Sequence, residues 1–256
     1  MPRVGQSNII GTVILIAAVL AISSVFLMYA MGNFNRAAAS AALSQVESFL
    51  TNVADDVEAS MYVPGTVLVY PVPSTGYGSF NLINRYCNYT IKGYGNFTSG
   101  AVVYGIPPGL LSYPVNFINV IRGGYGNGLP STTIDNPIVN NSAAPLVSIV
   151  QFGYGKVLNV NYGTYLVVFP RVMIVENQPT AYVYVPVFNT VVNPSLSSRG
   201  TLIINVTSVK STIVSLPSGS SVTVSGLCGG GLGGLITVSN LNSIDIIVIN
   251  MTVTYR

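Results

Sequence analysis

The chain opens with a long apolar segment. From Ile9 to Met31 only four residues are not apolar: Gly11, Thr12, Ser23 and Ser24. No charged residue occurs between Arg3 and Arg36. At a rise of about 1.5 Å per residue, this segment predicts a helix about 34 Å long, enough to cross the hydrocarbon core of a bilayer.

A second pattern continues the first without a break. From Arg36 to Met61 there is no Gly or Pro, and apolar residues recur every three or four positions, at Leu43, Val46, Leu50, Val53 and Val57. This spacing predicts an amphipathic helix over 36–61. Pro64 and Gly65 would end it. We therefore expect one helix from about Ser7 to Met61, on the order of 80 Å long, with Gly32 as the place where it bends or locally melts.

After Pro64 the pattern changes to short runs rich in Val, Ile, Tyr and Thr between Gly, Pro, Asn and Ser. These runs predict at least ten strands and no second helix, hence an all-β sandwich, Ig-like or barrel-like, in one or two domains. The fold class is α+β: one long helix, then an all-β domain. The predicted strands cover residues 66–72, 101–106, 115–121, 146–152, 164–169, 171–176, 181–188, 201–208, 221–226 and 243–255.

Charge is scarce, with 10 Lys and Arg and 7 Asp and Glu among 256 residues. No cluster of Lys and Arg suggests nucleic-acid binding. His is absent, and Asp135, Glu176 and Asp245 are far apart in the sequence. We therefore expect no enzyme, no metal site and no cofactor. The acidic cluster Asp55–Glu58 lies on the polar helix face, where we interpret it as solvated or paired with a neighbouring subunit.

Two cysteines, Cys87 and Cys228, lie in the strand-rich part. A disulfide is favoured over free thiols in an oxidising compartment, and the loop it would close contributes on the order of 4–5 kcal/mol. Cys228 opens the run CGGGLGGL, which a strand follows. A hairpin loop is therefore favoured over a phosphate-binding loop, which needs a following helix.

Five Asn-X-Ser/Thr sequons are present, on a domain with little charge to keep it hydrated. Glycans there would supply hydration and block pairing at sheet edges. We predict N-glycosylation among Asn88, Asn96, Asn140, Asn205 and Asn250.

The N-terminal segment admits several interpretations. A secretory signal has a shorter apolar region followed by a small-residue cleavage site. A plain single-pass anchor fits the hydropathy but leaves the helical extension to Met61 unexplained. The leader MPRVG, with Arg3 as its basic residue and Gly5 before Gln6, followed by a long apolar helix and a β-rich domain, resembles archaeal type IV pilins and their archaellin relatives.

The resemblance implies a leader at 1–5, a helix at 6–62 and a β-rich head at 63–256. A prepilin peptidase would cut between Gly5 and Gln6, and the pilus assembly machinery would then extract the helix from the membrane. Copies of the chain would form a helical homopolymer at the cell surface, a pilus for adhesion or, alternatively, the archaellum of a swimming cell. A surface protein that never polymerises is a third hypothesis. The expected filament-core residues are Ile9, Ile10, Val13, Ile14, Ile16, Leu20, Phe26 and Leu27.

Overall fold

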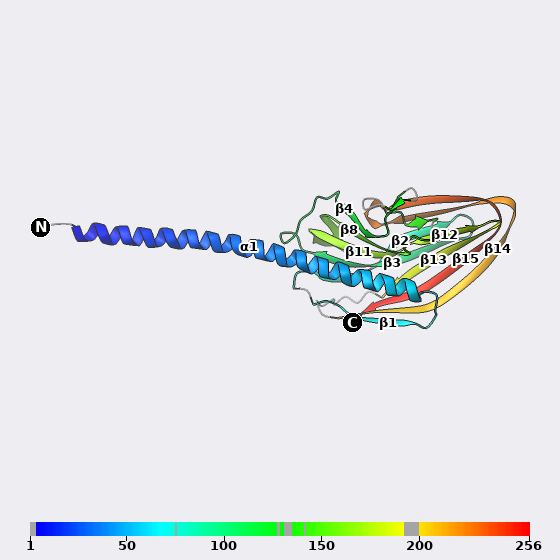
Figure 1. The fold of residues 1–256 in the computed structure, drawn as a ribbon, viewed down its shortest axis with the longest axis horizontal. Coiled ribbons are helices and arrows are strands. Elements are labelled where there is room, and N and C mark those ends of the chain that lie inside the picture. The colour runs from blue at the N-terminus through cyan, green and yellow to red at the C-terminus, as the bar shows by residue number, and fades with distance from the viewer. Residues whose placement is uncertain (1–3, 75, 127–128, 131–134, 141, 192–199) are drawn as a thin grey trace.

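A computed structural model describes residues 4–74, 76–126, 129–130, 135–140, 142–191 and 200–256 of the chain. It consists of one helix that projects from a β-rich head (Figure 1). The α+β class expected from the sequence is confirmed.

Helix α1 runs from Val4 to Ser60 as a single element. It stays helical through Gly32, so the helix does not melt there, and a bend at Gly32 stays a prediction. An α-helix satisfies its own backbone hydrogen bonds, and one glycine costs it only about 1 kcal/mol relative to alanine. The chain leaves the helix through Gly65, whose left-handed φ of 90° suits glycine. The Gly65 N–H then donates to the carbonyl of Val206 in the head (2.7 Å).

The strands of the head follow in chain order. They are β1 (Val67–Pro71), β2 (Ser79–Ile91), β3 (Gly95–Ile106), β4 (Ile118–Arg122), β5 (Tyr125–Gly126), β6 (Leu129–Pro130), β7 (Ile138–Val139), β8 (Val147–Phe152), β9 (Gly155–Val157), β10 (Val160–Tyr162), β11 (Thr164–Pro170), β12 (Val172–Asn177), β13 (Thr180–Thr190), β14 (Thr201–Cys228) and β15 (Gly233–Tyr255).

One 11-stranded sheet makes up most of the head. Its order is β4-β8-β11-β3-β2-β14-β15-β13-β12-β7, and β1 also pairs with β14. Neighbours are antiparallel except for the pairs β13–β15 and β12–β7, which are parallel. Two small two-stranded sheets, β9–β10 and β5–β6, lie beside it.

The sheet folds over on itself, so that β3 lies against β13 although the two strands are not hydrogen-bonded neighbours. Its strands therefore serve two cores. Along β3, Val102 and Tyr104 belong to the core that includes helix α1, whereas Ala101 and Val103 belong to the core enclosed between the two halves of the sheet. The alternation follows from the two-residue period of a strand. The head is thus layered like a sandwich, with the helix packed on one outer face.

Each predicted strand segment lies in or overlaps a strand, but two features differ. Segments 201–208 and 221–226, expected as separate strands, are parts of the single 28-residue strand β14. Register shifts near Ser215–Ser220 accommodate Pro217 and Gly219, which would otherwise interrupt pairing. Strand β2 and the short strands β5, β6, β7, β9 and β10 were not predicted. In β2, exposed polar residues such as Asn84 and Arg85 interrupt the pattern.

Candidate functional site: a projecting apolar helix

The N-terminal half of helix α1 stands clear of the head (Figure 1). Every residue from Gly11 to Ala37 is exposed. Among the described residues this is the one helix long and apolar enough to cross a membrane. A helix that is apolar on all sides is typical of an element that is covered by other helices or by lipid. The fold thus presents an apolar surface that needs a partner.

The residues predicted for a filament core lie on this exposed surface. Those whose side chains are described are between 53% and 70% exposed: Val13, Ile14, Ile16, Leu20, Phe26 and Leu27. Ile9 and Ile10 lie in helix α1, but their side chains are outside the description. Gly5 and Gln6 lie in the first turn of the helix, and Arg3 is outside the described residues.

The C-terminal half of the helix packs on the head. The predicted apolar face is confirmed, because Leu43, Val46, Leu50, Val53 and Val57 are all buried. Ala39 and Ala42, from the Ala-rich stretch 37–42, are buried as well. Small side chains let the helix axis approach the sheet closely, so part of this stretch serves packing within the chain.

A polar clamp fixes the last turns of the helix. The Arg122 guanidinium contacts the carboxylates of Asp55 (2.5 Å) and Glu58 (2.8 Å). The second oxygen of Glu58 accepts the backbone N–H of Val147 at 2.6 Å. Asp56 accepts a hydrogen bond from the hydroxyl of Tyr70 (2.9 Å). Asp55 and Asp56 are exposed, as expected for a solvated helix face, and Glu58 is half-buried. What the sequence did not predict is that strands distant in sequence bring partners from the same chain to all three acids.

Two tyrosines where the helix meets the head, Tyr62 and Tyr70, have raised pKa values. Burial, with smaller contributions from Tyr184 and Glu58, raises the pKa of Tyr62 to about 12. Its ring meets that of Tyr184 edge-on, with centroids 5.9 Å apart. Burial also raises the pKa of Tyr70, and the hydrogen bond to Asp56 adds to this effect. The neutral phenols are thus part of the contact between helix and head.

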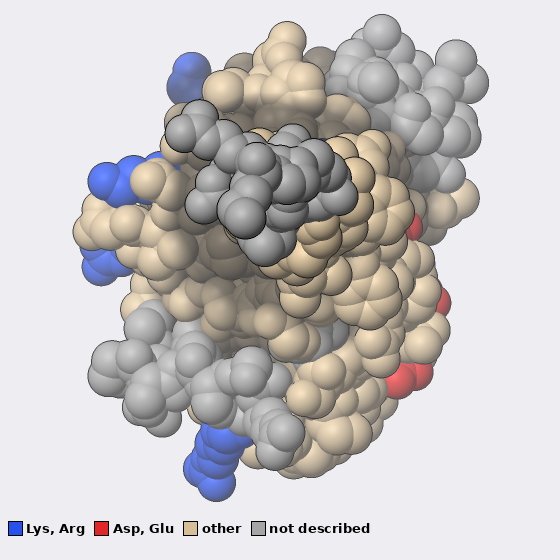
Figure 2. All heavy atoms as spheres, turned by 90° about the vertical axis from the view of Figure 1, so that its left-hand side faces the viewer, with Lys and Arg blue, Asp and Glu red and all other residues tan. Residues whose placement is uncertain are grey.

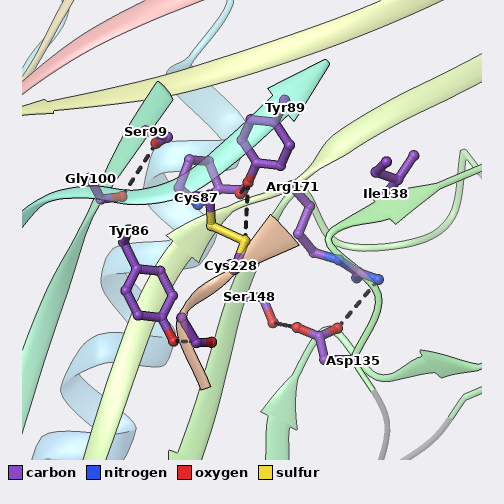
Figure 3. The surroundings of a disulfide bond; sticks show 12 residues. Tyr86, Cys87, Tyr89, Ser99, Gly100, Asp135, Ile138, Ser148, Arg171 and Cys228 are labelled. Atoms are coloured by element: carbon purple, nitrogen blue, oxygen red, sulfur yellow. Dashed lines mark hydrogen bonds and ion pairs between the residues drawn. A yellow bond between two sulfur atoms is a disulfide. The ribbon is translucent and has the colours of Figure 1, made fainter. Parts of the chain in front are cut away.

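Inside the head, Cys87 and Cys228 form a disulfide with a sulfur–sulfur distance of 2.03 Å (Figure 3). They are direct partners in the ladder between β2 and β14, and both are buried. The turn after Cys228 is a short 3-10 segment, Gly229–Gly231, that leads into β15, so the expected hairpin loop is confirmed. Glycine suits it because Gly230 and Gly231 have left-handed φ values.

A buried ion pair lies near the disulfide (Figure 3). Nη2 of Arg171 is 3.3 Å from Oδ1 of Asp135, and both side chains are fully buried. Ser148 donates to the other carboxylate oxygen, and Arg171 also donates to the carbonyls of Asn136 and Pro145. Burial raises the pKa of Asp135, while Arg171 and Ser148 act in the opposite direction. The sequence analysis missed this pair, although a lone Arg between two apolar strands signals a buried cation.

The sequons differ in accessibility. Asn88, Asn96 and Asn140 are exposed, the first two on neighbouring strands where Asn88 lies opposite Thr98. Asn205 and Asn250 are half-buried in paired strands. The Asn250 side chain donates to Ser208 (3.1 Å) and accepts from Asn189 (3.4 Å). The first three sites are therefore geometrically suited to carry glycans, whereas modifying Asn250 would break existing hydrogen bonds.

Among the described residues there is no group of three or more His, Cys, Asp or Glu side chains that could hold a metal ion. The predictions of no enzyme activity and no cofactor stay predictions. Comparison of the chain with protein-family models, with curated proteins and with solved structures finds no match. The features of the molecule that bear on its function are therefore the helix, the contact between helix and head, and the surface of the head.

Proposed function

We propose that the protein is the structural subunit of an extracellular filament of the archaeal type IV pilus class, built by packing of the N-terminal helices and serving adhesion or surface attachment. Its main partner is other copies of the same chain. The chain carries a helix compatible with a membrane anchor or a signal sequence, and we place this helix in the membrane before assembly.

The observation that carries the proposal is the contrast between the exposed, uncharged segment Gly11–Asn35 and the firmly packed segment that follows it. Such a helix satisfies its backbone internally and is equally stable in lipid or among identical helices. Because the helix is one rigid element with the head at one end, identical head-to-tail contacts repeated along an axis would generate an open fibre.

Leader removal is the step that would convert the anchor into a filament core. A prepilin peptidase acting between Gly5 and Gln6 would remove Arg3, the one basic group that precedes the apolar segment. The assembly machinery could then extract a helix whose apolar part carries no side-chain charge. Burying a charged side chain in such a bundle would cost several kcal/mol.

The decisive experiment is to express the full chain with a prepilin peptidase, shear off surface filaments and sequence the N-terminus of their subunit. We expect filaments whose subunit begins at Gln6. Gly5→Phe should abolish both cleavage and filaments by steric exclusion at the cut, and Gly5→Ala is the matched small control. A chain that stays in the membrane fraction with Met1 intact would instead establish a non-polymerising surface protein.

An archaellin of a swimming filament is the competing function within the same class. It predicts loss of swimming when the gene is deleted, whereas an adhesive pilus predicts loss of surface attachment with swimming intact.

A further inference from the structure

The end of the head from which the helix emerges carries a surface that the filament proposal does not use. We call it the basal rim and define it as the loop 107–117 between β3 and β4 together with the segment 154–163 that contains β9 and β10. The two parts are joined by hydrogen bonds: the Tyr154 N–H donates to the Tyr113 carbonyl (3.1 Å), and the Tyr113 N–H donates to the Gly163 carbonyl (3.0 Å).

The basal rim lies beside the helix at the level of Arg36. Arg36 lines a groove of about 350 Å³ together with Gly109, Leu110, Leu111, Ser112 and Tyr113. In Figure 1 the green loop that follows β3 extends along the helix at this end of the head. The contact fixes the height of the rim relative to the apolar span, because Arg36 and the apolar span belong to the same helix.

That height matches the headgroup layer of a bilayer. Arg36 is five residues beyond Met31, the end of the apolar span, which corresponds to about 7.5 Å along a helix. The polar layer of a bilayer extends about 5–7.5 Å beyond the hydrocarbon on each side. With the helix across a membrane, Arg36 and the basal rim therefore lie among lipid headgroups.

The chemistry of the basal rim suits this position. It exposes apolar side chains, with Val115 77%, Leu158 52% and Val160 46% exposed. Residues 107–117 and 154–163 contain Lys156 and no Asp or Glu. Figure 2, which looks toward this end of the head, shows Lys and Arg along its left and lower edges and acids only at its right edge. Apolar side chains flanked by basic groups are typical of surfaces that bind anionic membranes.

The basic groups are also available for such a partner. The three ion pairs found within the described part of the chain involve Arg122 and Arg171, so neither Arg36 nor Lys156 takes part in one.

We infer that the basal rim docks on the membrane surface before assembly, with Arg36 and Lys156 binding the phosphates of anionic lipids and Val115 inserting between headgroups. The inference rests on the membrane-anchored stage of the proposed function. Docking would hold the head against the bilayer and fix the helix in one orientation until extraction.

The test uses the full chain reconstituted in vesicles of phosphatidylcholine, with or without phosphatidylglycerol. A Val115→Cys variant carries an environment-sensitive dye, and nitroxide-labelled lipid quenches any dye at headgroup depth. A control dye goes on Ser218→Cys, in the bend of β14 that lies at the far end of the head, orange in Figure 1. We expect quenching at Val115 on the anionic vesicles and none at Ser218.

Neutralising single basic residues then tests whether Arg36 and Lys156 bind the anionic lipid. Arg36→Gln and Lys156→Gln should each lower the ratio of docked to undocked heads about fivefold on anionic vesicles, whereas Lys210→Gln on β14 is the charge-matched control and should leave the ratio unchanged. Added salt should weaken docking of the unmodified chain in the same direction.

Results that refute docking can be distinguished from results that refute the membrane-anchored stage. If the chain floats with the vesicles but the Val115 dye stays unquenched on both lipids, docking is wrong and the anchored stage stands. Energy transfer between dyes on separate chains, independent of lipid charge, would assign the basal rim to contacts between copies and overturn the inference. A chain that does not float with vesicles would refute the anchored stage itself, and docking with it.

Discussion

The two halves of helix α1 have the same backbone and opposite surroundings. From Gly11 to Ala37 every residue is exposed, whereas the half that begins at Ala39 buries its apolar face on the sheet and pairs Asp55 and Glu58 with Arg122. One half therefore contributes to the stability of the chain, and the other is reserved for a partner outside it. A residue's position along a single helix decides whether its substitution should affect folding or assembly.

The largest expected effect is on the folding stability of the head and not on membrane insertion or assembly. Replacing both cysteines, Cys87→Ala with Cys228→Ala, removes a cross-link between residues 141 positions apart. The chain-entropy model predicts a loss of about 5 kcal/mol in the free energy of unfolding of the head. Urea unfolding of the detergent-solubilised chain measures it. Membrane insertion of the projecting helix should be unchanged, and an equal loss of insertion would show that the two halves are coupled.

A matched pair of leucines compares the halves directly. Leu50 is 1% exposed and Leu20 is 62% exposed. Leu50→Ala should lower the free energy of unfolding by about 2–5 kcal/mol, because it leaves a cavity between helix and sheet. Leu20→Ala should change the same quantity by less than about 0.5 kcal/mol. Similar losses from both variants would mean that the projecting half folds against the head.

A charge at the middle of the apolar span should affect membrane insertion and leave folding stability unchanged. Leu20→Lys should cost about 2.5–3.5 kcal/mol in membrane insertion while leaving the urea midpoint of the head unchanged. Asn35→Lys places the same charge beyond the span and is the control. Vesicle flotation after alkaline extraction measures insertion, and normal insertion of Leu20→Lys would argue against a membrane-spanning role for this segment.

The clamp at the end of the helix should give a smaller effect. Arg122→Gln removes the cation from the partly buried Glu58 and the exposed Asp55. We expect a loss of about 1–2 kcal/mol, between the values typical of surface and buried pairs. Added salt should reduce the difference between the variant and the unmodified chain. Arg85→Gln, an exposed arginine on β2, is the control in the same urea titration, and an equal loss there would remove the special role of the clamp.

The smallest effect concerns alkaline pH. An unfolded tyrosine ionises near pH 10, whereas Tyr62 in the folded chain has its pKa raised to about 12. The unfolded state therefore loses its proton first, so the contribution of Tyr62 to stability is complete below pH 10 and is lost as the pH rises toward 12. Tyr62→Phe should lessen this alkaline loss in urea midpoints measured on either side of pH 10. An equal alkaline loss in Tyr62→Phe and in the unmodified chain would contradict the role of Tyr62.

The local patterns of the sequence were sufficient for the helix and for most strands. The spacing of Leu43, Val46 and Leu50 reports a helical face, and the alternation in 181–188 reports a half-buried strand, because both periods are set by the backbone of the segment itself. The continuity of β14 was not predictable in this way. Pro217 and Gly219 resemble the end of a strand, and only the pairing with β15 shows that the strand continues past them.

Local sequence patterns could not predict which residues pair with the charged groups. Glu58 meets Arg122 and Val147, and Arg171 meets Asp135, across sequence separations that the order of strands in the sheet determines. That order depends on long-range packing, which periodicity does not report. The sequence therefore indicated which surface was apolar and projecting but not how the head holds it, nor that the basal rim would lie at the height of Arg36.

The disulfide has a mechanical consequence for a chain that is pulled along its length. Force applied between the N-terminal helix and the C-terminus cannot extend the 141-residue interval between Cys87 and Cys228 while the bond is intact. At about 3.3–3.6 Å per extended residue, this interval amounts to about 480 Å of contour that stays out of reach. An oxidised subunit under tension would therefore lengthen far less than a reduced one, so the bond limits how far the chain can stretch as well as how stable it is.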